Sequence, residues 1–200
     1  MSSPGIKVEC LLNVVKVSEY DALLTAVQHI ARHAAYSRNN DTKPVDCWQT
    51  DVLIEEYCEG PEADCNFVLW KGEFLFFEVV VNFPCAGDNV AAGNFKETQL
   101  VFPSASPPEQ QDVLRDSLLK SILHLGFHSG IFHVEARVRN STHEYRPSPN
   151  DQGIDLHPRS EPAPSDASVF LIEINARPQG IWTHAQACFL TVLTSSRYRL

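Results

Sequence analysis

The stretch 131–138 (IFHVEARV) decides the fold, because apolar and polar residues alternate along it. Side chains of a strand point to opposite faces in turn, so the apolar residues share one face and the other face carries His133, Glu135 and Arg137. The stretch 169–175 (VFLIEIN) has the composition of a second strand, and Glu173 and Asn175 share one of its faces. The sequence therefore predicts two strands that each carry polar side chains on one face.

Glu135, Glu173 and Asn175 form a candidate metal site. Carboxylates within otherwise apolar strands are costly unless a cation compensates them. The three side chains offer only oxygen ligands, which suit Mg²⁺ or Mn²⁺ better than zinc and leave room for phosphate oxygens. The alternative is that this face is solvated and that its acids pair with Arg137 and Arg177.

Two amphipathic helices are expected beside these strands. Apolar residues recur at helical spacing over 18–36 and 107–125. Ser106 is the expected N-cap of the second helix, with Glu109 in its first turn, and Gly126 is expected to end it. Helices and strands in this arrangement predict an α+β protein.

Further strands are expected over four segments: 6–17, 52–57, 64–70 and 73–81. Lys71 and Gly72 join the last two as a tight hairpin turn. The stretch 83–97 is rich in Gly, Ala and Asn and is expected to be a loop. The stretch 139–168 is rich in Pro, Ser, Asp and Asn, and we expect it to be a disordered insertion.

Composition and charge exclude several classes of protein. The chain has 200 residues, of which 44% are hydrophobic and 20% charged, as in a folded globular protein. A net charge of -9 argues against nucleic-acid binding. No apolar stretch approaches the roughly 18 residues of a membrane span, and no signal peptide is visible, so a cytoplasmic protein without membrane contact is expected. The six cysteines form no C-x-x-C pair and are expected to be free thiols.

Three segments resemble the motifs of ATP-grasp ligases, in that family's order. The segment 52–62 (VLIEEYCEGPE) resembles the family's hinge, and 125–135 (LGFHSGIFHVE) resembles its passage from a helix to the first metal carboxylate. The segment 170–177 (FLIEINAR) resembles its second metal strand. The resemblance covers about residues 2–182, and within the superfamily it is nearest to carnosine-synthase-like ligases in 95–103 and 130–135.

The resemblance implies a partial ATP-grasp fold, with the nucleotide between a small lid lobe (1–58) and an antiparallel-sheet lobe (59–200). It implies that adenine is held by a hinge segment, which consists of Glu55, Glu56, Tyr57 and Cys58. It implies that Glu62 binds the ribose hydroxyls and that Mg²⁺ is bound by Glu135, Glu173 and Asn175. Arg177 would hold a phosphate oxygen, the acyl phosphate or the substrate carboxylate. Asp64 and His133 are secondary candidates on the same strands.

The implied enzyme joins a small-molecule carboxylate to an amine, with amino acids as the expected substrates, through an acyl phosphate formed from ATP. The family's phosphate-binding lysine would lie before Met1, because Lys7 and Lys16 do not match its place. The isolated chain is therefore expected to have little ligase activity. One alternative is a non-catalytic ATP-grasp remnant that binds nucleotide weakly or acts as an interaction module. Another is a carboxylase or purine-synthesis member of the same superfamily.

Overall fold

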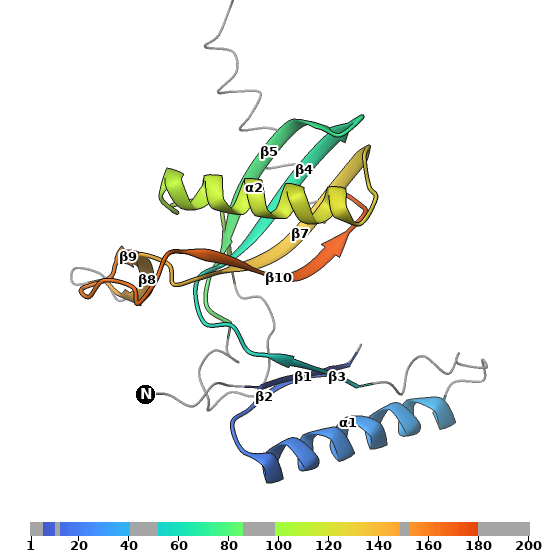
Figure 1. Cartoon of the computed structure of the whole chain (residues 1–200). Helices are drawn as coiled ribbons and strands as arrows, with labels where there is room; N and C mark the ends of the chain where they lie inside the picture. The colour runs from blue at the N-terminus through green and yellow to red at the C-terminus, as the bar shows by residue number, and fades with distance from the viewer. Residues whose placement is uncertain (1–5, 11–12, 41–51, 86–98, 149–152, 180–200) are drawn as a thin grey trace, which may run out of the picture. The chain divides into compact units, whose positions relative to one another are not determined.

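The computed structural model describes residues 6–10, 13–40, 52–85, 99–148 and 153–179 (Figure 1). Contacts divide the chain into two compact units, which consist of Met1–Cys58 with Cys85–Thr98, and of Glu59–Pro84 with Gln99–Leu200. The first unit includes Cys85–Thr98, which the sequence analysis assigns to the second lobe, and the lid lobe over 1–58 stays a prediction. Neither helix of the described residues offers an apolar stretch that could cross a lipid bilayer.

The first unit contains a three-stranded antiparallel sheet of order β2-β1-β3 and one helix. Its elements are β1 (Ile6–Cys10), β2 (Asn13–Val17), α1 (Tyr20–Asn40) and β3 (Leu53–Glu56). Val17 from the sheet packs with Ala26 and Ile30 from the helix, and this contact forms a small core. The strand structure predicted over 6–17 and the predicted helix are thus confirmed. The helix begins two residues later and ends four residues later than the expected 18–36.

The second unit contains a five-stranded antiparallel sheet of order β10-β7-β4-β5-β6 (Figure 1). Its strands are β4 (Glu62–Trp70), β5 (Glu73–Asn82), β6 (Leu100–Val101), β7 (Gly130–Arg139) and β10 (Ser168–Asn175). Lys71 and Gly72 join β4 to β5 with φ angles of 53° and 89°, which is the backbone of the predicted tight hairpin turn. The predicted loop over 83–97 lies mostly outside the described residues.

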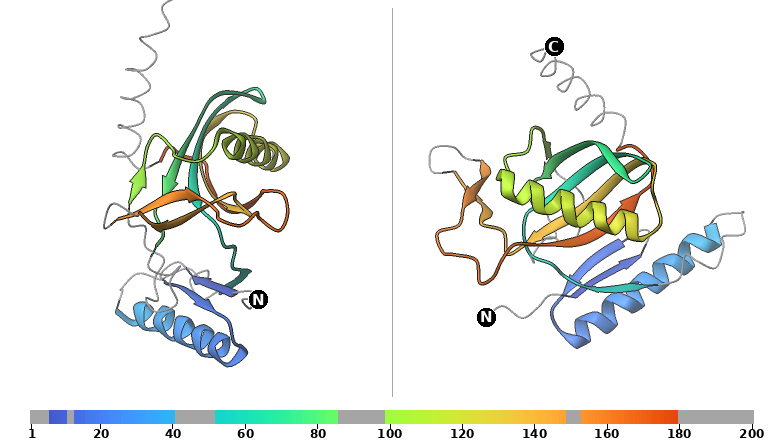
Figure 2. Two further views of the ribbon diagram at one scale, coloured as in Figure 1. Left: turned by 90° about the vertical axis from the view of Figure 1, so that its left-hand side faces the viewer. Right: turned by 45° about the horizontal axis from the view of Figure 1, so that its top comes forward.

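One face of this sheet is covered by α2 (Pro108–His124), which lies across the strands (Figure 2). Leu114, Leu118 and Ile122 of the helix are at most 1% exposed. They pack against alternate residues of three strands: Ala63, Cys65, Phe67, Leu69, Val79, Phe132, Val134, Ala136 and Val138. This is the apolar face that the alternation of 131–138 predicts.

The ends of α2 agree only in part with the sequence. The helix ends as predicted: Gly126 has a φ of 88°, and Phe127 N donates to Ile122 O at 3.2 Å in a Schellman motif. The prediction of Ser106 as N-cap is wrong, because the cap residue is Pro107 and no side chain caps the helix. The helix begins at Pro108, so Ser106 is one residue too far away, and a proline has no N–H to cap.

The prediction of a disordered insertion over 139–168 is also wrong for the described residues. An antiparallel pair, β8 (His143–Pro147) and β9 (Ile154–Pro158), occupies this stretch. Gln110 of α2 anchors its start, because its Nε2 donates to Thr142 Oγ1 at 2.7 Å and its Oε1 accepts from Ser141 Oγ at 2.9 Å. Composition was misleading because cross-strand pairing, rather than a large apolar content, forms this hairpin.

Candidate functional site

The face of the five-stranded sheet opposite α2 carries polar side chains in rows across the strands. In the order β10, β7 and β4, one row consists of Glu173, Glu135 and Asp64. The neighbouring row, in the same order, consists of Asn175, His133 and Asn66. Residues that are directly paired share a face, and their Cβ atoms lie about 4.5–5.5 Å apart. The register thus brings together the three residues that the sequence proposed as metal ligands.

A β-bulge in β10 aims Glu173 at this face. Leu171 is paired with Ala136 and Glu173 with Glu135, so two steps along β10 match one step along β7. The bulge adds one residue to β10. As a result, Leu171 lies on the α2 face of the sheet like its partner Ala136, and Glu173 lies on the opposite face like its partner Glu135. Two carboxylates therefore stand directly opposite each other on neighbouring strands.

The proposed metal ligands differ in exposure. Glu173 is exposed, Glu135 and Asn175 are half-buried, and Glu173 has no ion-pair partner among the described residues. Asn175 Nδ2 is buried and has no hydrogen-bond partner in the described part of the chain. Because the two ends of an amide have the same shape, a rotated amide would present Oδ1 there instead. An unpartnered amide beside two opposed carboxylates fits a divalent cation.

The ligand set is small. Within the described residues, no cluster of three or more His, Cys, Asp or Glu side chains has the geometry of a metal site. A cation bound here would depend on two carboxylates, one amide and further oxygens from a bound molecule. Such partial coordination is usual for Mg²⁺, which keeps several waters or phosphate oxygens as ligands.

His133 connects the two rows and is 4% exposed. Its Nδ1 lies 3.2 Å from Asn66 Oδ1, and its Nε2 lies 3.5 Å from Glu135 Oε1 and 4.0 Å from Asp64 Oδ2. Burial opposes the imidazolium, but the hydrogen bond to Glu135 and the charges of Asp64 and Glu135 outweigh it, so the pKa of His133 is raised. The positive charge of Arg177 acts in the opposite direction and lowers the pKa of His133.

Glu62 lies one row further along the same face, opposite Arg137. Its Oε2 accepts from Arg137 Nη2 at 2.7 Å and from Nε at 2.9 Å, and its Oε1 accepts from Asn82 Nδ2 at 3.3 Å. Arg137 thus pairs with Glu62, and Arg177 Nη1 donates to Pro178 O at 3.1 Å. Within the described part of the chain, neither arginine forms an ion pair with Glu135 or Glu173, as the solvated-face alternative requires.

The predicted adenine-binding residues belong to the first unit. Glu55 and Glu56 lie in β3, and Tyr57 and Cys58 follow it as buried residues. Lys16 Nζ lies 3.6 Å from the centre of the Tyr57 ring, which is a close cation–π contact. This contact joins the segment to β2 of the same unit. The role of the segment toward adenine stays a prediction.

Sequence reasoning missed the residues that complete the polar face: Asn66, Glu78, Asn82 and Gln179. Asn66 Nδ2 donates to Glu78 Oε1 at 3.0 Å, and Asn82 Nδ2 donates to Asp64 Oδ1 at 2.9 Å. The available signal was the alternation of Glu62, Asp64 and Asn66 along β4, which matches the polar alternation along β7.

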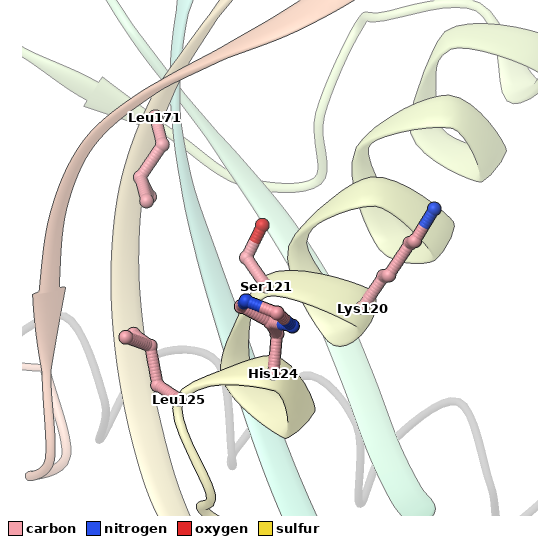
Figure 3. A pocket seen from close by; sticks show the side chains of 5 residues that line it. All are labelled: Lys120, Ser121, His124, Leu125 and Leu171. Atoms are coloured by element: carbon pink, nitrogen blue, oxygen red, sulfur yellow. The ribbon is translucent and has the colours of Figure 1, made fainter.

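A separate cavity of about 420 Å³ lies on the other side of the sheet, beside the C-terminal end of α2 (Figure 3). It is lined by Lys120, Ser121, His124, Leu125 and Leu171. The Lys120 side chain points away from β10, so leucines dominate the part beside that strand (Figure 3). None of the predicted site residues lines it, so its size carries no weight for the candidate site.

No family model matches the chain. It is 40% identical over 138 residues to the ATP-grasp enzyme fsqD of Aspergillus fumigatus, an alignment that covers 66% of this chain and 24% of that protein. It is 30% identical over 91 residues to human carnosine synthase 1, which covers 46% of this chain and 10% of that protein. The chain therefore spans a quarter or less of these relatives.

Solved structures show the same fold. An L-amino acid ligase from Bacillus licheniformis aligns with 92% of this chain and 34% of its own, at a TM-score of 0.58 and 18% identity. A D-alanine–D-alanine ligase from Bacillus anthracis aligns with 93% of this chain and 50% of its own, at a TM-score of 0.55 and 14% identity. A Hydrogenobacter thermophilus biotin carboxylase domain in complex with MgADP and bicarbonate aligns with 91% of this chain and 32% of its own, at a TM-score of 0.55 and 12% identity.

Proposed function

This chain is an ATP-grasp protein with carnosine synthases among its relatives, and from that premise we propose that its polar sheet face binds Mg²⁺-ATP in a carboxylate–amine ligase. The observation that carries the proposal is the pairing of Glu135 with Glu173, with Asn175 on the same face. Two opposed carboxylates repel each other unless a cation lies between them. The structural neighbour whose crystals contain MgADP supports nucleotide and magnesium as ligands of this fold.

The side chains have separate proposed roles. Glu135, Glu173 and Asn175 hold Mg²⁺ or Mn²⁺, which neutralises charge on the phosphate oxygens when bound. Arg177 is exposed just after β10 and has a guanidinium fork that can bind a phosphate or carboxylate oxygen. Glu62 binds the ribose, with its carboxylate oriented by Arg137. The hinge residues of the first unit hold adenine: Glu55, Glu56, Tyr57 and Cys58.

The proposed reaction has two steps. A carboxylate oxygen of one substrate attacks the γ-phosphorus of ATP, and the bond to the β-phosphate oxygen breaks to release ADP. The amine nitrogen of a second substrate then attacks the acyl carbon, phosphate leaves, and the nitrogen loses a proton. Positioning and electrostatic stabilisation supply most of the catalysis in such a transfer, and the guanidinium of Arg177 is suited to both. Amino acids are the proposed substrates.

Titration calorimetry with MgATP tests the proposal on the 200-residue chain. The wild type should release or absorb heat with Mg²⁺ present and none after EDTA is added. Glu173→Gln should weaken binding by at least about tenfold, as alterations around metal sites commonly do. Glu73→Gln is the matched control, because Glu73 is an exposed glutamate of the same sheet that is paired with Trp70 rather than with a carboxylate.

The outcomes separate the alternatives. No heat from the wild type at millimolar MgATP would remove the nucleotide-site proposal. Equal loss of binding in Glu173→Gln and Glu73→Gln would show that net charge, rather than this pair of carboxylates, governs binding. Binding without ATP-dependent amide formation from amino acids would favour the non-catalytic alternative for this chain.

A further inference from the structure

Gln179 is a buried glutamine that joins the end of the chain's last described segment to the middle of the sheet. It lies four residues after the end of β10 and is 7% exposed. Its Nε2 donates to Asp64 Oδ2, and its Oε1 accepts from Asn66 Nδ2 at 3.0 Å. Asp64 and Asn66 are two residues apart on the polar face of β4, so one amide group spans two neighbouring rows.

We propose that Gln179 is a positioning residue that ties the segment 176–179 to β4 and so holds Arg177 and Asn175 beside Glu135 and Glu173. The proposal rests on the proposed function and adds to it a residue that acts through its neighbours. Its first support is the register, which ends at Asn175 paired with His133. Beyond that pair, the hydrogen bonds that join 176–179 to the sheet within the described residues are those of Gln179.

The local sequence strengthens this role. Pro178 fixes its own φ, and a residue that precedes a proline is restricted to extended conformations, so the backbone of Arg177 has little freedom. A short segment with restricted backbone needs only one firm contact at its far end to define its direction. Gln179 supplies that contact two residues beyond Arg177.

The partners of Gln179 are themselves fixed. Asp64 is 1% exposed and its other oxygen accepts from Asn82 Nδ2 at 2.9 Å. Asn66 Oδ1 faces His133 Nδ1, and His133 in turn faces Glu135. Gln179 is thus linked through Asn66 and His133 to the carboxylate that is paired with Glu173. A change at Gln179 should reach both sides of the proposed metal site.

The test exchanges donor and acceptor between two partners. Gln179→Glu places a carboxylate oxygen against Asp64, whereas the double variant Asp64→Asn with Gln179→Glu allows the asparagine amide to donate to the new carboxylate. Hydrogen exchange of the amides of 173–179, measured by mass spectrometry on the metal-free chain, reports the position of the segment. Gln179→Glu should raise the exchange rate of these amides about tenfold, which is the order expected for one lost buried hydrogen bond. The double variant should lower the rate again, close to that of the wild type.

Gln110→Glu is the matched control, because Gln110 is also a buried glutamine with two side-chain partners, and these belong to the hairpin start rather than to the metal rows. It should leave exchange at 173–179 unchanged. Gln179→Met, which has similar length and no polar group, repeats the test if the charged variant unfolds. MgATP affinity should fall in Gln179→Glu and recover in the double variant.

Unchanged exchange in both Gln179→Glu and Gln179→Met would overturn the positioning role, as would a double variant no better than the single one. Exchange does not require a ligand, so it tests this inference even if the wild type binds no nucleotide. Loss of the proposed function and loss of this inference are therefore distinguishable.

Discussion

The two faces of the five-stranded sheet are built by the same strands and have opposite properties. The face under α2 contains Phe67 and Val134, both fully buried among other apolar side chains. The other face contains Asp64 and His133, which are 1% and 4% exposed but have polar partners on three strands. Burial alone therefore does not separate the structural face from the candidate functional face.

What separates the faces is the kind of interaction that compensates for lost water. Apolar contacts stabilise the α2 face in rough proportion to buried area. On the polar face each buried group needs a specific donor or acceptor, and removal of one partner leaves the other unsatisfied. Glu135 and Glu173 carry like charges directly opposite each other where this face reaches solvent, and this is where we propose that a cation binds.

The largest loss of stability is expected on the apolar face. Phe67 is 0% exposed, and its ring centre lies 4.8 Å from that of Phe77. Phe67→Ala should lower the free energy of unfolding by about 3–5 kcal/mol, a large share of a typical total of about 5–15 kcal/mol. Urea denaturation followed by circular dichroism measures this. Phe74→Ala is the control. Because Phe74 is 45% exposed, this substitution should lower the free energy of unfolding by less than about 1 kcal/mol. Equal losses would contradict the assignment of the core.

A smaller loss is expected when one partner of the buried ion pair is removed. Arg137 Nη2 lies 2.7 Å from Glu62 Oε2, and the side chains are 6% and 21% exposed, respectively. Arg137→Met should cost about 2–3 kcal/mol, below the range for fully buried pairs because Glu62 keeps some water. Arg115→Met should cost much less than Arg137→Met, although Arg115 Nη1 lies only 2.6 Å from Asp112 Oδ1, because water screens that exposed pair. If the shorter pair contributed more to the denaturation midpoint, burial would not be the deciding factor.

The smallest effect should have the opposite sign. Like charges directly opposite each other in a sheet are destabilising, so Glu173→Gln should raise the stability of the metal-free chain by about 0.2–1 kcal/mol. Denaturation in EDTA measures the gain, which should shrink in high salt as screening weakens the repulsion. Glu73→Gln should show no such gain. A less stable Glu173→Gln protein would mean that this carboxylate already has a stabilising partner, and the argument for a cation would lose its basis.

Much of this arrangement could be predicted from the sequence. The alternation of 131–138 gave both faces of β7, and the spacing of Glu173 and Asn175 gave their common face. Periodicity also predicted both helices, and the two residues between neighbouring strand segments predicted the turn at Lys71 and Gly72. These features depend on residues close together in the chain, where local geometry decides the outcome.

The features that could not be predicted depend on distant residues. The bulge between Leu171 and Glu173 exists only relative to β7, so β10 by itself gives no sign of it. The contacts of Gln179 with Asp64 and Asn66 span 115 and 113 residues of chain. The β8–β9 hairpin was hidden by a polar composition that is also typical of disorder. In each case the missing information was the pairing partner rather than the residue.

The alternation of β7 has a consequence for how this gene can change over time. Deletion or insertion of a single codon within the strand would turn every following side chain to the other side, which would place Glu135 or Arg137 under α2 and expose the phenylalanine or valine that packs there. Changes of length should therefore accumulate outside the paired strands, as in the stretch that joins β8 to β9. Substitutions that keep chain length can still adjust the chemistry without disturbing the core.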